Sequence, residues 1–296
     1  MDPTHEAGRA SVSRGLILLF CTLAGLLVIS GGSIAMSITS GLGLSTSQQV
    51  AFVRGSYAVM ILGSLAATVV LHKNTHLRPF WRLAFAYFVA CCAIMVSDYT
   101  GDWALNLSGQ ALNTAKGFAA LKLGEDAAIV GTIIVLTLLT RDDPNELFLS
   151  KGRLGLGLVV GASSFLVFTV VGLSSTIAKG IQPDKVGELL PAFLLIALAD
   201  GLMEELLFRG LFLRRLGRFV GDNWANIVTA IVFTFMHMGV QFTATLPVFL
   251  MIVLLLGLLW GWIMQKTGSV LAPALFHAGV DMLIIADSFA AFDIRN

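Results

Sequence analysis

Long apolar runs separated by short polar segments dominate the chain. A helix needs about 20 predominantly apolar residues to cross the hydrocarbon core of a bilayer. Nine stretches approach that length, although the third and fourth are short: Gly15–Ser37, Gly55–Leu71, Leu83–Val96, Ala127–Thr140, Leu154–Ser174, Phe193–Leu216, Trp224–Phe242, Leu246–Met264 and Val270–Ile285. This pattern predicts an all-α fold, a polytopic membrane helix bundle with eight or nine transmembrane helices.

The composition supports a multi-pass integral membrane protein that has membrane lipid as a partner. Charged residues make up 12% of the chain, about half of the usual 25% or so in soluble domains. Lipid solvates apolar side chains, so a fold in a bilayer does not need a charged surface. The net charge is +1 and there is no basic block, which argues against nucleic acid as a partner.

We divide the chain into a polar tail over residues 1–14, N-terminal transmembrane helices of unknown role over 15–180, and a core over 188–290. Lys and Arg are enriched on the cytoplasmic side of membrane proteins. With nine spans and the N-terminus inside, thirteen of the nineteen Lys and Arg residues fall on the inner side. We therefore expect a cytoplasmic N-terminus. As the location we expect a bacterial cytoplasmic membrane.

Ionisable side chains are concentrated in the last four predicted spans. They are Asp200, Glu204, Glu205, Arg209, His237, His277 and Asp281. A charge at the centre of a membrane helix costs about 2.5–3.5 kcal/mol on insertion scales, so such residues pair with each other or line a wet cavity. This concentration indicates a functional site inside the membrane.

The spacing of these residues predicts how they are arranged. Glu205 and Arg209 are four residues apart, so they share a helix face and can form an ion pair. Glu204 is rotated from Glu205 by ~100° about the helix axis, so we expect it to point elsewhere. At ~1.5 Å of rise per residue, Glu204, His237 and His277 all lie near the middle of their spans. Three helices can thus bring one carboxylate and two imidazoles together.

Three motifs in these spans resemble those of a known family. Glu204 to Arg209 reads EELLFR, Phe233 to His237 reads FTFMH, and His277 to Asp281 reads HAGVD. These look like the EExxxR, FxxxH and HxxxN/D motifs of the CAAX protease and bacteriocin-processing (CPBP, or Abi) family, in the family's order. Its eukaryotic member is the type II CAAX prenyl endopeptidase. The resemblance covers about Phe193 to Ile285, roughly a third of the chain.

The resemblance implies an intramembrane peptidase and a role for each matching residue. Glu204 would activate water, His237 would position that water, and His277 and Asp281 would stabilise the oxyanion. Glu205, Arg209 and Phe233 would support the site. An ionised aspartate cannot donate a hydrogen bond, so Asp281 must be protonated to act on an oxyanion, or else it orients His277 or binds another group.

The metal requirement is open at this stage. Glu204, His237 and His277 match the His₂Glu set of catalytic zinc sites, and the family is often called a metalloprotease family. The resemblance also implies a metal-free, glutamate-dependent mechanism for the prenyl endopeptidases, and the zinc motif HExxH is absent from the chain. We expect no required cofactor, with Zn²⁺ on those three residues as the alternative.

The leading hypothesis is hydrolysis of a membrane-associated peptide or protein, with CaaX-type C-terminal processing as one option. A non-catalytic membrane scaffold or bacteriocin-immunity factor with the same fold is the first alternative. A proton-coupled transporter is the second, because chains of Asp, Glu and His can relay protons. We find none of the internal repeats that are frequent in transporters.

Overall fold

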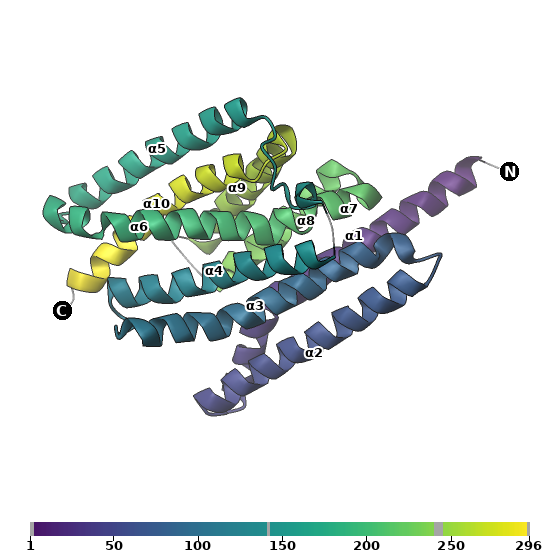
Figure 1. Ribbon diagram of the computed structural model, residues 1–296, viewed down its shortest axis with the longest axis horizontal. Helices are drawn as coiled ribbons and strands as arrows, with labels where there is room; N and C mark the ends of the chain where they lie inside the picture. Colours follow the sequence, from purple (N-terminus) through teal and green to yellow (C-terminus); the bar gives the residue numbers. More distant parts are fainter. Residues whose placement is uncertain (1–2, 141–142, 240–244, 295–296) are drawn as a thin grey trace. The chain divides into compact units, whose positions relative to one another are not determined.

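The computed structural model describes residues 3–140, 143–239 and 245–294, and the side chains of residues 13–140, 143–239 and 245–284. Within these ranges every regular element is a helix (Figure 1), which confirms the all-α prediction. The helices form two compact units. Unit 1 contains Met1–Met95 and Leu211–Gly261, and unit 2 contains Val96–Gly210 and Trp262–Asn296.

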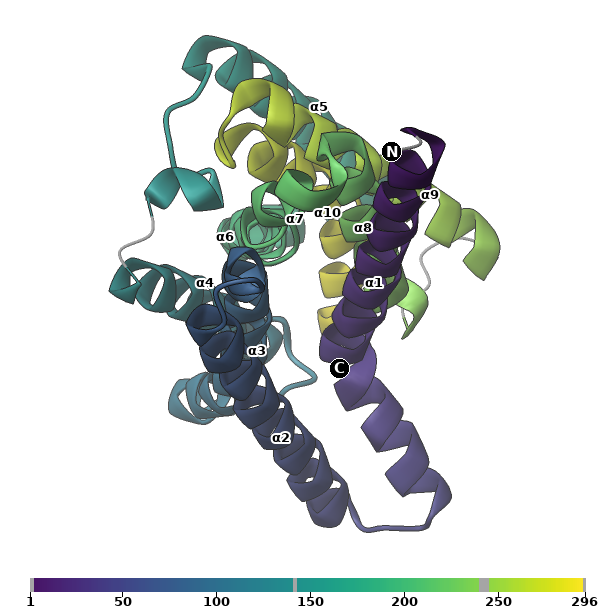
Figure 2. The same ribbon diagram turned by 90° about the vertical axis from the view of Figure 1, so that its right-hand side faces the viewer.

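Unit 1 is built around a hairpin of two long helices. Its helical elements are α1 (Pro3–Gly41), α2 (Thr46–Lys73), η1 (Arg78–Phe80), the first part of α3 (Trp81–Ser108), α7 (Leu213–Val220), α8 (Asp222–Met236), η4 (His237–Gly239) and most of α9 (Leu246–Thr267). Figure 2 shows α1 and α2 joined by a tight turn. At that turn Ser45 caps α2: its hydroxyl accepts from the Gln48 amide, and the Gln48 side chain accepts from the Ser45 amide. This capping box satisfies amides at the helix start that lack an intrahelical partner.

Unit 2 holds most of the ionisable residues singled out above. Its helical elements are the rest of α3, α4 (Ala115–Leu139), η2 (Pro144–Leu147), α5 (Leu154–Ala178), α6 (Pro183–Glu204), η3 (Glu205–Gly210), the end of α9 and α10 (Leu271–Ile294). In Figure 1, α10 lies between α5 and α6, and α4 runs along α6. Small residues allow this packing: a Cβ added at Gly279 of α10 would lie 2.7 Å from the Phe165 Cα of α5. Such close backbone approach is typical of membrane helix interfaces.

Six described helical segments are long and apolar enough to cross a membrane, which supports an integral membrane protein. They are Ser13–Gly41, Thr46–Lys73, Arg78–Ser108, Leu154–Ala178, Pro183–Val220 and Leu246–Thr267, and Leu271–Ile284 is a shorter apolar helix. The other two predicted spans correspond to α8, with 15 residues, and to α4, which contains Lys122, Glu125 and Asp126. The prediction of eight or nine spans therefore remains a prediction.

Candidate active site

The two glutamates of the first motif lie where α6 changes its helical geometry. Glu204 is the last residue of α6, and Glu205 begins a π-helical turn that ends at Gly210. Isolated π turns inside longer helices occur frequently at functional sites. Glu204 is 9% exposed, and Glu205 and Arg209 are completely buried. The motif therefore places three charged side chains inside the protein.

Glu205 and Arg209 form the predicted ion pair. The Arg209 Nη1 donates to the Glu205 Oε1 over 2.7 Å. A pair buried to this degree contributes little net stability, but removing one partner leaves an uncompensated charge. Because each charge has the other as its partner, the ion pair explains how the π turn can hold both residues within an apolar helix.

His277 of α10 connects the two glutamates. Its Nδ1 lies 3.1 Å from Glu205 Oε1, and its Nε2 lies 3.3 Å from Glu204 Oε2. One imidazole therefore contacts both carboxylates, and its contact with Glu205 was not expected from the spacing. Glu204 and Glu205 are separated by ~100° about the helix axis. The His277 ring can contact both because its two nitrogens lie on different sides of the ring.

A glycine of α6 lets α10 come close enough for these contacts. A Cβ added at Gly201 would lie 2.8 Å from both the Ala274 carbonyl oxygen and the Ala278 amide nitrogen. Sequence reasoning missed this residue. The signal was present, because Ala197 and Gly201 on α6, and Ala274 and Ala278 on α10, are pairs of small residues four apart, a spacing typical of close membrane helix pairs.

Asp281 lies one helical turn after His277 and approaches the same ring. Its Oδ1 is 3.6 Å from His277 Nε2, which is an ion-pair distance but too long for a hydrogen bond. The structure therefore brings Glu204, Glu205, Arg209, His277 and Asp281 together within unit 2.

His237 ends α8 and belongs to unit 1. Its Nδ1 lies 3.0 Å from the Phe233 carbonyl oxygen. A carbonyl only accepts, so Nδ1 carries the proton and Nε2 of the neutral ring presents a lone pair. The His237 ring also packs on the Phe233 ring with centroids 4.6 Å apart, and Phe233 meets Trp260 edge-on at 5.9 Å. Phe233 of the FxxxH motif therefore fixes the tautomer and the position of the His237 ring. That His237 lies close to Glu204 stays a prediction.

Comparison with protein families identifies the segment that carries these motifs. Residues 186–283 match the family described as Rce1-like, type II CAAX prenyl endopeptidase Rce1-like. The match confirms the resemblance to the CAAX protease family. It covers about a third of the chain and includes Glu204, His237, His277 and Asp281. Comparisons with curated proteins and with solved structures gave no match.

A partly buried charge cluster next to the CAAX protease motifs joins Lys122 and Asp126 of α4, outside the matched segment, to Asp200 of α6. The Lys122 Nζ lies 3.1 Å from Asp200 Oδ1 and 3.5 Å from Asp126 Oδ1. Asp126 is 1% exposed, and Asp200 lies one turn before Glu204 on α6. Sequence reasoning left Asp200 out of the site and gave Lys122 no role, although the i,i+4 spacing of Lys122 and Asp126 was a usable signal.

The metal prediction concerns Glu204, His237 and His277, which belong to both units, and it stays a prediction. Among the residues with described side chains, no group of three or more His, Cys, Asp or Glu is arranged to hold a metal ion. Within unit 2, Glu204 and His277 supply two candidate ligands, and the neighbouring Glu205 is engaged by Arg209. We therefore derive no step through a metal.

Proposed function

We propose that this protein is an intramembrane endopeptidase that hydrolyses a peptide bond of a membrane-associated peptide or protein. The contact between Glu204 and His277, buried in the segment that matches the CAAX protease family, is the observation that supports this. CaaX-type C-terminal processing is the specific option that the family suggests. We place the N-terminus in the cytoplasm and the protein in a bacterial cytoplasmic membrane.

In the proposed reaction Glu204 acts as the general base. Its carboxylate takes a proton from a water molecule, and the water oxygen forms a bond to the carbonyl carbon of the substrate. The C–N bond then breaks, and the proton held by Glu204 passes to the leaving amine. A positioned general acid or base contributes about 10²–10⁴-fold to rate. We propose that His237, with a lone pair on Nε2, accepts a hydrogen bond from the same water.

We propose that His277 stabilises the negative charge that develops on the carbonyl oxygen. In this role both ring nitrogens carry a proton: Nδ1 donates to Glu205, which also accepts from Arg209, and Nε2 donates to the developing oxyanion. A preoriented donor of this kind can act without reorganising during the reaction. The 3.6 Å between Asp281 and His277 Nε2 supports a role for Asp281 in orienting His277. Donation by a protonated Asp281 to the oxyanion is the alternative.

The decisive test uses purified wild type, Glu204→Gln and Glu188→Gln in detergent. Glu188 is a matched control because it lies on α6 and its side chain is 59% exposed. Cleavage of a panel of prenylated and unprenylated peptides is measured by mass spectrometry. We expect cleavage by the wild type and the control, and a loss of about 10²-fold or more in Glu204→Gln. Equal cleavage by Glu204→Gln would show that another group is the base.

The same assay addresses the metal. We expect a strong zinc chelator to leave cleavage unchanged. Loss of activity that returns on addition of Zn²⁺ would instead show a metal requirement and favour the alternative with Zn²⁺ on Glu204, His237 and His277.

A further inference from the structure

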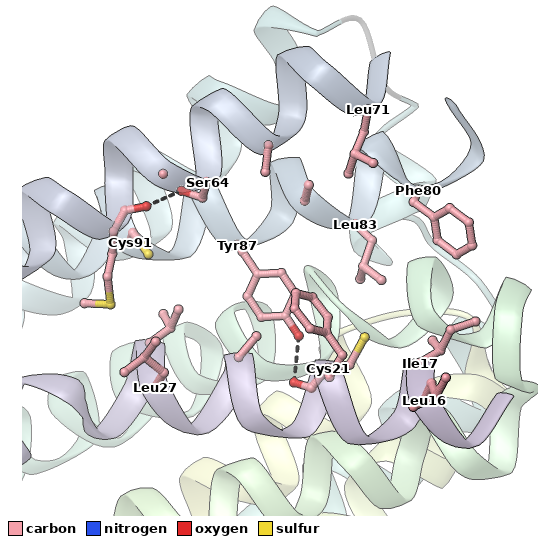
Figure 3. Close-up of a pocket in the computed structure, with 17 residues that line it drawn as sticks. Leu16, Ile17, Cys21, Leu27, Ser64, Leu71, Phe80, Leu83, Tyr87 and Cys91 are labelled. Atoms are coloured by element: carbon pink, nitrogen blue, oxygen red, sulfur yellow. Dashed lines mark hydrogen bonds between the residues drawn. The ribbon is translucent and has the colours of Figure 1, made fainter. Parts of the chain in front are cut away.

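An apolar pocket of about 590 Å³ lies within unit 1, outside the segment that matches the CAAX protease family. Its wall is formed by residues 16–28 of α1, 60–71 of α2 and 80–91 of η1 and α3 (Figure 3). The volume is in the range of about 300–1,000 Å³ that is usual for small-molecule sites. This pocket plays no part in the proposed peptidase chemistry.

The inner surface of the pocket fits a hydrocarbon chain. No Asp, Glu, Lys or Arg is among the lining residues. The two hydroxyl groups of the wall are already used, since Ser64 donates to the Met60 carbonyl at 2.6 Å and Tyr87 to the Cys21 carbonyl at 2.8 Å (Figure 3). Leu16 and Phe20 are 62% and 68% exposed, so the pocket opens between membrane-spanning helices.

Basic residues lie close in sequence to the residues that line one end of the pocket. Figure 3 shows Leu71 and Phe80 at the same end, and the exposed Lys73 and Arg78 each lie two residues from one of them along the chain. Phe80 also stacks on Phe219 of α7 with centroids 4.5 Å apart. That contact brings to this end the part of α7 that carries the exposed Arg218, the neighbour of Phe219 in sequence.

The charge pattern of this region goes beyond what membrane topology requires. Residues 7–97 contain no Asp or Glu, and their Lys and Arg residues are Arg9, Arg14, Arg54, Lys73, Arg78 and Arg82. The positive-inside rule accounts for Lys and Arg in inner loops, but Asp and Glu contribute little to topology. Their absence over three helices favours an anionic ligand.

We propose that this pocket binds one acyl chain of an anionic glycerophospholipid from the surrounding bilayer. The chain lies between α1, α2 and α3, and the phosphate group contacts Lys73, Arg78 and Arg218. The apolar wall selects the chain, and the basic end selects the charge of the headgroup. The proposal is independent of the peptidase function.

The pocket is tested with Gly63→Phe. Gly63 lines the pocket and has nothing within 4 Å of an added Cβ, so the aromatic ring enters the cavity. Gly55→Phe is the matched control, because Gly55 also lies on α2 in open space but does not line the pocket. Native mass spectrometry counts the phosphatidylglycerol and phosphatidylcholine molecules, with identical chains, that each variant retains.

The basic end is tested with the double variant Lys73→Gln/Arg78→Gln. Arg54→Gln is its control, since Arg54 lies on α2 about 28 Å from Lys73 along the helix axis. Both substituted residues of the double variant are exposed, so this arm remains informative if Gly63→Phe folds poorly.

We expect the wild type and both controls to retain phosphatidylglycerol in preference to phosphatidylcholine. Gly63→Phe should lose both lipids, and the double variant should lose the preference by about fivefold per charge removed. Equal retention of the two lipids by the wild type, or wild-type retention by Gly63→Phe, would overturn the proposal. A neutral probe, N-acetyl-S-farnesylcysteine methyl ester, is run in parallel. If Gly63→Phe loses only this probe, the pocket holds an isoprenoid chain and not a phospholipid.

Discussion

At the scale of single residues, the site is held together by charges that satisfy one another away from water. Glu205 and Arg209 are both completely buried, and His277 approaches the same Glu205 oxygen at 3.1 Å. Each of these residues would be costly alone in an apolar helix. Glu205 and Arg209 therefore act together to hold His277 beside Glu204.

Removing Arg209 should destabilise the protein strongly. Arg209→Met leaves Glu205 buried without its guanidinium partner, and breaking a buried pair in this way costs about 3–5 kcal/mol. The unfolding temperature in detergent is the measurement, with Arg218→Met, an exposed arginine of α7, as the control. The double variant Glu205→Gln/Arg209→Met should be more stable than Arg209→Met. If Arg209→Met matches the control, the pair has no structural role.

Lys122 should influence catalysis although it lies outside the motifs. Asp200 lies one turn before Glu204 on α6, and the Lys122 ammonium, which contacts both Asp200 and Asp126, offsets part of the negative charge near Glu204. We expect Lys122→Gln to lower kcat by about tenfold, with little change in KM. This corresponds to an increase of ~1.4 kcal/mol in the activation free energy. Lys116→Gln is the control, because Lys116 lies on the same helix and is exposed. Equal kcat values for the two variants would contradict this electrostatic role.

At the scale of helices, the site depends on how closely α10 approaches α6. The hypothetical Cβ at Gly201 comes within 2.8 Å of the α10 backbone. A side chain there must push the helices apart and move His277 away from both glutamates. The position of His277, a proposed catalytic group, is thus set by a glycine that takes no part in the proposed chemistry.

Gly201→Leu should therefore impair both stability and activity. Overpacking typically costs about 1–3 kcal/mol, and a displacement of about 1 Å near a reacting centre can cost about 10²-fold in rate. Gly187→Leu is the matched control, because Gly187 lies on α6 with nothing within 4 Å of an added Cβ. The unfolding temperature and peptide cleavage are measured for both. Wild-type cleavage by Gly201→Leu would mean that close packing of α10 is not required.

At the scale of the whole molecule, the number of spans depends on α4. Its 25 residues extend about 37 Å, enough to cross a bilayer core of about 30 Å. Its charged residues would normally argue against a membrane helix, but Lys122 is paired with Asp126 and with Asp200 of α6. Because this pairing offsets the charges, we expect α4 to cross the membrane.

Cysteine labelling tests this expectation. In a background in which Cys21, Cys91 and Cys92 are replaced by alanine, Lys151→Cys and Lys179→Cys place a thiol before and after α5. With α4 crossing and the N-terminus inside, a membrane-impermeant maleimide added to intact cells should label Lys179→Cys and not Lys151→Cys. The opposite labelling would mean that α4 does not cross the membrane.

Much of the site could be predicted from the sequence because its motifs are local. The pairing of Glu205 with Arg209 and the proximity of His277 to Asp281 follow from four-residue spacing on a helix. The helical fold class and the membrane setting follow from the long apolar runs. The extents of α3 and α4 were less predictable, because the polar stretch from Asp98 to Asp126 covers the end of α3 and the start of α4. Polar residues can lie in these helices because a charge such as Lys122 pairs with Asp200 of another helix.

What the sequence determined by itself is therefore the helical fold class, the membrane setting, the family resemblance and the residues that share a helix face. Only the tertiary structure decided that His277 bridges Glu204 and Glu205, that Gly201 admits α10, and that Lys122 joins Asp200. The reason is physical: a helix repeats every 3.6 residues and so fixes neighbours along the chain. Contacts between residues 72 positions apart, such as Glu205 and His277, depend on which helices pack together and how closely their backbones meet.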